Sequence, residues 1–436
     1  MSFKHLFLSS ILLFCFAAES FAYPIDGYLL TGIRRLMRLE LIQKGELKDT
    51  PLLKGAQKSL KDIQLHLYQT AKGDSLTELP PVDVALQKGL DALFPNLHES
   101  YSITLMDITP GQTIRYAKRK EERGFQPGSV GKLAVITALF CEMENLYPDS
   151  FELRRDLLKN RKVKGGKWAV YDEHTVPFYD PETKKFFKRQ VQESDVFSLY
   201  EWADHTLSVS NNGAASVVWR EAILMYVFGE KYLTLTEAEA DAYFKNTSKA
   251  ELADIAITVV NGPLESLGIT NEEWRLGQMF TRGATGIIPG KGGSIGTPEG
   301  LMKWMVALER GAVIDPASSL EIKRLMYMTD RRIRYAANEN LKSAAVYFKS
   351  GSLYSCDRTT MSDCGKYRGN VQNYMNSVAI IEHDNGTTYL VALMSNVLRK
   401  NSNIDHNTLA GRIDKLVKSF APPPPPEKPA IDSSGK

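Results

Sequence analysis

The sequence predicts an α/β (α+β) protein in which an antiparallel sheet is flanked by helices and interrupted by an inserted all-helical part. Two observations lead to this prediction. Strand patterns occur at residues 101–117 and return only at residues 344–393. Apolar residues with helical spacing dominate the stretch between them, about residues 133–330. The sheet is therefore expected to be split in sequence, with the helical part between its halves.

The N-terminus has the pattern of a cleavable export signal. A polar start with Lys4 precedes a largely apolar run at residues 6–18, and Ser20 and Ala22 form a small-x-small cleavage site. The apolar run is too short to span a bilayer comfortably, which argues against an uncleaved anchor. We expect a signal peptide at residues 1–22 and a periplasmic or secreted protein.

Three further regions follow the signal. Residues 23–85 have amphipathic patterns and are predicted to form an N-terminal helical extension. Residues 86–420 are predicted to form one catalytic domain that contains the split sheet. Residues 421–436 include five consecutive prolines and no apolar run, which predicts an extended, disordered tail.

Local signals place elements inside the catalytic domain. A turn at Pro110 and Gly111 joins two strands at residues 101–106 and 113–117. A long apolar helix is expected over residues 129–146. The last two strands, at residues 377–382 and 389–393, meet across Asp384-Asn385-Gly386, a strong hairpin signal, and a closing helix follows at residues 405–420.

Composition excludes two classes of function. The chain of 436 residues has 54 Lys and Arg against 51 Asp and Glu, a net charge of +3, without the clustered basic stripe typical of nucleic-acid proteins. Its seven histidines are scattered, with no pair at metal-ligand spacing. We therefore expect no nucleic-acid partner, no metal and no cofactor.

Cysteine usage agrees with export. Cys356 and Cys364 bracket a short polar loop, which predicts a disulfide in an oxidising compartment. Cys15 would leave with the signal. Cys141 lies in an apolar helical run and is predicted to be a buried free thiol.

The first motif with chemical content is Ser129-Val130-Gly131-Lys132. Residues three apart at a helix start share a face, so the Lys132 amine is expected behind the Ser129 hydroxyl. A serine needs a neighbouring base to become a nucleophile, and a buried lysine can be that base. By itself the pattern is common, and a second Ser-x-x-Lys at residues 433–436 lies in the predicted tail.

The second motif is Ser210-Asn211-Asn212, expected in a tight loop between two helices. There Ser210 would relay a proton to a leaving nitrogen, and Asn212 would bind a substrate amide. The simpler alternative is an ordinary helix N-cap, because Ser and Asn are preferred at that position.

The third motif is Lys349-Ser350-Gly351 at the end of a predicted strand. Lys349 and Ser350 would bind a substrate carboxylate, and Gly351 would allow a close approach of the backbone. The N–H of Ser352 would form an oxyanion hole with that of Ser129. The simpler alternative is a solvated strand end.

The three motifs occur in the order Ser-x-x-Lys, Ser-x-Asn, Lys-Ser-Gly, a combination far rarer than any one of them. On these residues the chain resembles the serine β-lactamase and penicillin-binding superfamily, nearest to class A β-lactamases, over about residues 100–420. Further likeness lies in Gly213-Ala214-Ala215 and in the Pro-Gly and Thr-Pro-Glu stretches near residues 289 and 298. The resemblance implies that Ser129 is acylated, that Lys132 and Ser210 handle protons and that Lys349 binds the substrate carboxylate.

The chain departs from class A at one point. That class places a glutamate about nine residues before the glycine of the Pro-Gly pair, where it activates the water that removes the acyl group. Here residues 278–283 contain no acid, and Glu272 and Glu273 lie upstream. The departure predicts slow deacylation or the use of another acceptor, unless a shifted loop brings in Glu272 or Glu273 as the base. A milder change is Asn211 in place of the usual aspartate.

Three functional hypotheses follow. The first is an exported serine hydrolase that opens β-lactams in the manner of class A β-lactamases. The second is a D-alanyl-D-alanine carboxypeptidase or transpeptidase-like protein that acts on peptidoglycan peptides. The third is a non-catalytic binding protein that retained the fold. The first two share the acyl-enzyme on Ser129 and differ in how fast it is released.

Overall fold

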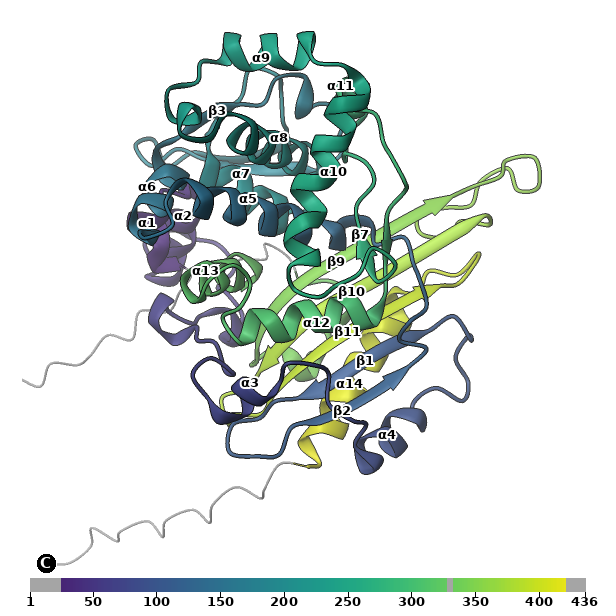
Figure 1. Ribbon diagram of the computed structural model, residues 1–436. Helices are drawn as coiled ribbons and strands as arrows, with labels where there is room; N and C mark the ends of the chain where they lie inside the picture. The colour runs from purple at the N-terminus through teal and green to yellow at the C-terminus, as the bar shows by residue number, and fades with distance from the viewer. Residues whose placement is uncertain (1–24, 328–331, 421–436) are drawn as a thin grey trace, which may run out of the picture.

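The computed structural model describes residues 25–327 and 332–420 (Figure 1). The predicted signal peptide at residues 1–22, the predicted tail at 421–436 and the second Ser-x-x-Lys match at 433–436 lie outside the described residues. No helix among the described residues is long and apolar enough to cross a membrane.

Five strands form the central sheet in the order β2-β1-β11-β10-β9, and every neighbouring pair is antiparallel. They are β1 (Ser102–Asp107), β2 (Arg115–Arg119), β9 (Ala345–Ser355), β10 (Gln372–Glu382) and β11 (Thr388–Asn396). The first two strands and the last three are far apart in sequence, so the predicted split antiparallel sheet is confirmed. The hairpin predicted at Asp384-Asn385-Gly386 joins β10 to β11, with Gly386 at φ 88°.

Helices cover both faces of the sheet (Figure 1). One apolar core joins the sheet to α4 (Val84–Asp91) and α14 (Asn403–Lys418), the predicted closing helix. A larger core lies on the other face, where α12 (Pro298–Glu309) packs on β11 and β1. All residues of β11 except the last are buried, because its side chains point into a core on either side.

The larger core continues into the inserted helical body. Its centre is α5 (Lys132–Leu146), which packs against α8 and α10 and is buried along most of its length. A helix that is apolar on nearly all sides is stable only inside a protein, and this one is enclosed by its neighbours. The surrounding helices are α6 (Phe151–Asn160), α7 (Leu199–Leu207), α8 (Asn212–Phe228), α9 (Glu237–Asn246), α10 (Lys249–Glu265), α11 (Arg282–Ile287) and α13 (Pro316–Tyr327).

The inserted part is not all-helical, which corrects the sequence prediction. It also contains three two-stranded sheets: β3 (Lys162–Lys164) with β6 (Val196–Ser198), β4 (Thr175–Tyr179) with β5 (Phe186–Gln190), and β7 (Trp274–Arg275) with β8 (Ile295–Gly296). The β4–β5 hairpin is stabilised by a cross-strand stack of Phe178 on Phe187, with ring centroids 5.1 Å apart. This pairing depends on contacts between the two strands, so the charged sequence of the hairpin contains little local signal for it.

The helical prediction for residues 23–85 is too broad. Regular α-helix is limited to α1 (Tyr28–Thr31), α2 (Arg34–Gln43), α3 (Ala71–Ser75) and the start of α4, with short 3₁₀ turns between them. Elsewhere the backbone bonds to the body, for example from Gly55 N to Lys342 O at 3.0 Å. A Cβ on Gly55 would lie 1.9 Å from Ala344 O, so the segment lies directly against the body.

The N-terminal segment is tied to the helix that leads into the second motif. Arg35 makes a two-pronged ion pair with Asp204 of α7, at 2.7 and 2.6 Å, and both side chains are buried. Arg34 pairs in the same manner with Glu201, one turn earlier. Bidentate guanidinium–carboxylate pairs hold a fixed geometry, so this segment supports the position of α7.

A disulfide joins Cys356 and Cys364, with Cα atoms 5.9 Å apart, in the loop between β9 and β10. The sequence predicted this pairing. Cys141 is a free thiol, as expected, but it is half-buried rather than fully buried.

Candidate active site

Ser129 lies where the chain turns into the central helix. The 3₁₀ turn η4 (Gly128–Gly131) follows Pro127 and continues into α5. Gly128 has φ 54°, and a Cβ there would lie 2.9 Å from Ser352 N, so only glycine suits this close approach to β9. The Ser129 hydroxyl is thus held at a helix N-terminus, where partial positive charge stabilises developing negative charge.

The Lys132 amine joins the first two motifs. Its Nζ lies 3.0 Å from Ser129 Oγ, and it donates to Ser210 O at 2.6 Å and to Asn212 Oδ1 at 2.7 Å. A neutral amine has two N–H donors and one lone pair. With both donors used by Ser210 and Asn212, the lone pair is left for the Ser129 hydroxyl.

Burial lowers the pKa of Lys132 to about 7, although the negative charge of Asp172 acts in the opposite direction. A buried ammonium loses its hydration, which favours the neutral form. Near neutral pH a large share of Lys132 is therefore the free base that the Ser129 hydroxyl needs.

Ser210 occupies the predicted loop between α7 and α8. Its backbone is left-handed, with φ 61°, an uncommon conformation for a non-glycine residue. Its hydroxyl accepts from Lys349 Nζ at 2.8 Å and lies 3.4 Å from Lys132 Nζ. The N-cap of α8 is Asn211, whose side chain accepts from Ala214 N, so the capping role falls on the middle residue of the motif and leaves Ser210 facing the site.

Lys349 and Gly351 lie on β9 beside η4. A Cβ on Gly351 would lie 2.2 Å from Pro127 O and 3.0 Å from Ser129 N, so the strand touches the Ser129 turn. Burial, with the positive charges of Lys132 and Arg334, lowers the pKa of Lys349 well below its usual value. A bound carboxylate would raise this pKa again, because an opposite charge nearby favours the ammonium form.

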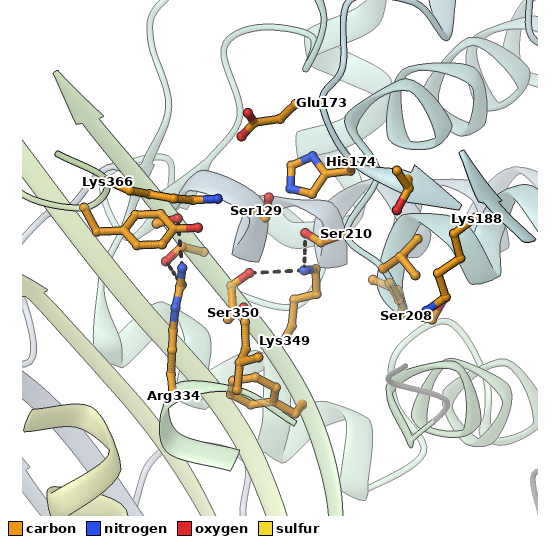
Figure 2. A pocket seen from close by; sticks show the side chains of 18 residues that line it. Ser129, Glu173, His174, Lys188, Ser208, Ser210, Arg334, Lys349, Ser350 and Lys366 are labelled. Atoms are coloured by element: carbon orange, nitrogen blue, oxygen red, sulfur yellow. Dashed lines mark hydrogen bonds between the residues drawn. The ribbon is translucent and has the colours of Figure 1, made fainter. Parts of the chain in front are cut away.

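Two adjoining cavities meet at Ser129. The first, of about 350 Å³, is lined by Ser210, Lys349, Ser350 and Ser352 among others (Figure 2). The second, of about 290 Å³, is lined by Asn212 and by residues 276–280. Ser129 borders both. The structure thus brings together all eight residues that the sequence singled out: Ser129, Lys132, Ser210, Asn212, Lys349, Ser350, Gly351 and Ser352.

One side of this cleft we name the motif wall: Ser129, Lys132, Ser210, Asn212 and Lys349. A second segment beside this cleft, residues 276–281, we name the neutral wall. Within the described chain the neutral wall carries no carboxylate, and its Thr281 hydroxyl donates to Trp168 O at 2.9 Å. Glu272 and Glu273 line neither cavity, and Glu273 pairs with Lys303.

Sequence reasoning missed several residues of the cleft. Arg334 donates to Gly351 O at 2.8 Å and to Ser352 Oγ at 3.0 Å, and it places a guanidinium beside the Lys349 strand. It begins the 3₁₀ turn η7 (Arg334–Ala337), and no motif in the sequence marks this arginine among its neighbours. Lys366 and Tyr367, from the loop after the disulfide, line both cavities.

The loop Asp172-Glu173-His174 was also missed. Asp172 accepts from Asn212 N at 2.5 Å and from Asn212 Nδ2 at 3.1 Å. Glu173 and His174 line both cavities, and Glu173 is the one carboxylate in either lining set of the described residues. The signal was three adjacent ionisable residues, Asp172, Glu173 and His174, in a stretch rich in charged residues to which the sequence analysis assigned no function.

Metal ligation has little support at this site. Among the described residues, one cluster of three carboxylates has the geometry to hold a cation: Glu121, Glu122 and Glu299. None of these residues lines either cavity at Ser129.

A split antiparallel sheet with helices on both faces, and a serine and lysine at the start of a buried helix, define the β-lactamase/transpeptidase fold. The profile of the beta-lactamase enzyme family matches residues 85–419. The chain belongs to this family. A search of curated protein sequences found no match.

Solved structures with similar folds include both β-lactamases and a penicillin-binding protein. The L158E mutant of PBP-A, in an acyl-enzyme complex with penicillin G, is 14% identical, covers 78% of this chain and 99% of its own, and has a TM-score of 0.47. A class A β-lactamase from Bacteroides cellulosilyticus is 16% identical, with coverage of 77% and 96% and a TM-score of 0.48. An ancestral class A β-lactamase of Gram-negative bacteria is 18% identical, with coverage of 78% and 100% and a TM-score of 0.47.

Proposed function

We propose that this protein is an exported serine acyl-transfer enzyme that forms an acyl-enzyme on Ser129 with β-lactams and with peptides of the D-alanyl-D-alanine type. The observation that carries the proposal is the Lys132 amine, buried and held 3.0 Å from Ser129 Oγ with its two donors engaged elsewhere. A nucleophile within hydrogen-bond distance of an oriented base is the arrangement that acyl transfer requires.

In this proposal, acylation proceeds in three steps. Lys132 takes the proton of Ser129, and Oγ bonds to the substrate carbonyl carbon. The carbonyl oxygen becomes negative and is stabilised by the N–H groups of Ser129 and Ser352. The carbon–nitrogen bond then breaks, and the proton passes from Lys132 through the Ser210 hydroxyl to the leaving nitrogen.

The substrate carboxylate would bind at the middle of β9, because the strand continues through the third motif to Ser355 and does not end at Lys349 as the sequence predicted. Lys349 and the Ser350 hydroxyl face the first cavity, and the Arg334 guanidinium adds positive charge beside Ser352. Charge-assisted hydrogen bonds of this kind orient a carboxylate and select substrates that carry one. Both β-lactams and C-terminal peptides satisfy this requirement.

The neutral wall favours acyl transfer from cell-wall peptides over efficient β-lactam hydrolysis. A β-lactamase needs a base that activates water against the ester, and residues 276–281 supply none. The acyl group from a β-lactam should therefore remain on Ser129 long enough to be trapped. This is the specific observation in favour of a D-alanyl-D-alanine peptidase or transpeptidase as the natural activity.

A fluorescent penicillin with intact-mass analysis tests the acyl-enzyme, and a chromogenic cephalosporin tests its release. We expect a single adduct on Ser129 and a stoichiometric burst followed by slow steady-state turnover. An adduct on another residue would refute the site. Rapid turnover without a burst would instead establish an efficient β-lactamase, and its loss in Glu272→Gln or Glu273→Gln would identify a base from outside the cleft.

Export is a separate part of the proposal and rests on the signal at residues 1–22. Fractionation of cells that express the full chain should place the protein outside the cytoplasm, with its N-terminus at residue 23. A chain that keeps residues 1–22 in the cytoplasm would contradict this part.

A further inference from the structure

The loop at residues 172–174 contains an Asp–His pair beside the nucleophile. Asp172 Oδ1 lies 2.6 Å from His174 Nδ1, and the Asp172 side chain is only 2% exposed. Burial raises the pKa of Asp172, but the hydrogen bond and charge of His174, the charge of Lys132 and the hydrogen bond from Asn212 N together lower it below its usual value. A buried carboxylate that accepts from Nδ1–H holds the imidazole in one tautomer and leaves the lone pair on Nε2.

The position of this pair is set by the second motif. His174 O accepts from Asn211 Nδ2 at 3.0 Å, and Asp172 accepts from Asn212 N at 2.5 Å. The loop is therefore bonded to the same turn that presents Ser210. A shift of either segment would break contacts on both.

His174 borders the space around the nucleophile. It lines both cavities together with Ser129, and its side chain is 37% exposed (Figure 2). Ser210, the proposed proton donor to the leaving nitrogen, lines the first of these cavities with it. His174 thus borders the space that a leaving amine vacates.

We propose that His174, oriented by Asp172, is the general base that activates the acceptor in the second half-reaction, where the acyl group leaves Ser129. The inference rests on the proposed function and supplies the group that the neutral wall lacks. The acceptor is water or an amine that enters through the space left by the departed amine.

In the proposed release step, one proton moves to His174 and then to Ser129. His174 Nε2 takes a proton from the acceptor, whose oxygen or nitrogen bonds to the acyl carbon. The oxyanion hole holds the negative oxygen until the bond from that carbon to Ser129 Oγ breaks. The proton taken by His174 returns to Ser129 Oγ, so the free serine and the neutral imidazole are both restored. No oxidant, reductant or metal is needed.

This placement makes acyclic and cyclic substrates behave differently. When an acyclic peptide or thioester reacts, its leaving group departs and the space beside His174 opens. When a β-lactam reacts, the expelled amine stays tethered to the acyl group and keeps occupying that space. Release should therefore be faster for acyclic acyl groups than for β-lactams.

The test uses an acyclic D-alanyl thioester that carries a terminal carboxylate, together with a fluorescent penicillin. The thioester burst reports acylation, and its steady state reports release. In His174→Gln we expect stoichiometric penicillin labelling and an unchanged burst, with release slowed by ~10²-fold or more, the usual size of general-base assistance. Imidazole added to His174→Ala should restore part of the release rate, which a purely structural role would not allow.

Glu173→Gln separates the imidazole from the neighbouring carboxylate. A loss of release there as large as in His174→Gln assigns the base to Glu173 and overturns the inference. Unchanged release in His174→Gln overturns it as well, as does loss of the acylation burst. If the wild-type protein forms no adduct on Ser129, the proposed function itself is wrong and the inference falls with it.

Discussion

The motif wall and the neutral wall border the same cleft and are built differently. On the motif wall, buried polar side chains from three separate segments bond to one another, as Lys132 does to Ser210 and Asn212. On the neutral wall, Met279 and Phe280 face the cavity and the Thr281 hydroxyl is used by the backbone. The cleft thus places an amine beside the Ser129 hydroxyl, whereas residues 276–281 offer no carboxylate.

We therefore expect acylation of Ser129 and release of the acyl group to depend on different parts of the cleft. Changes on the motif wall should act on acylation, whereas changes in the surrounding loops should act on pH dependence, release or stability.

Ser129→Ala should abolish labelling by penicillin, because the Ser129 hydroxyl is the proposed nucleophile, held at the helix N-terminus 3.0 Å from Lys132 Nζ. Intact mass after incubation measures the adduct, and circular dichroism checks that the fold is retained. An adduct that persists in this variant would break the assignment of the motif wall to acylation.

Lys132→Ala should slow acylation by roughly 10²–10⁴-fold, the usual contribution of a general base. In the wild type the active form is the neutral amine, so the acylation rate should rise as pH increases through about 7, the pKa of Lys132, and level off above it. Stopped-flow labelling across pH measures both effects.

Lys132→Arg is the matched control, because a guanidinium retains the charge and cannot act as a base at neutral pH. It should be as slow as Lys132→Ala. A recovery of acylation in the arginine variant would mean that Lys132 acts through its charge alone.

Lys349→Ala should weaken reaction with substrates that carry a free carboxylate by roughly 10- to 100-fold, the range for a hydrogen bond to a charged group. Esters without that carboxylate should lose much less. Comparison of kcat/KM for a matched acid and neutral ester measures the difference. Equal losses for both would make Lys349 a structural residue of the motif wall.

In Asp172→Asn, the fall of the acylation rate on the acid side of its pH profile should shift to lower pH. The Asp172 charge raises the pKa of Lys132, while burial lowers it. Removal of that charge, with Lys349 and the His174 ring still nearby, favours the neutral amine at lower pH. The same pH series measures it, and an unchanged profile would show that the loop does not influence the Lys132 base.

Replacement of both Cys356 and Cys364 by serine should have the smallest effect on acylation. The bridge closes a loop with a sequence separation of 8 residues, so its removal should cost about 2–3 kcal/mol of unfolding free energy at most. Thermal unfolding of the variant measures this cost. Non-reducing peptide mapping of the exported wild type should show the bridge, and two free thiols would contradict it.

The sequence alone was enough to predict the local elements and the residues of the three motifs. Strand patterns and the Asp384-Asn385-Gly386 turn are encoded within a few residues, because backbone preferences act over that range. The three motifs were recognisable because each places particular residue types at a fixed spacing, and their order points to one family.

The pKa values of the site residues, and the contacts they make with distant segments, depend on the tertiary structure. The pKa of Lys132 depends on burial of α5 under other helices and on the charge of Asp172. Arg334, Asp172 and His174 belong to segments outside the three motifs, and no local sequence pattern predicts the contacts that these residues make. Distances between remote segments, and the loss of water around a charge, arise from packing of the whole chain, so no local pattern contains them.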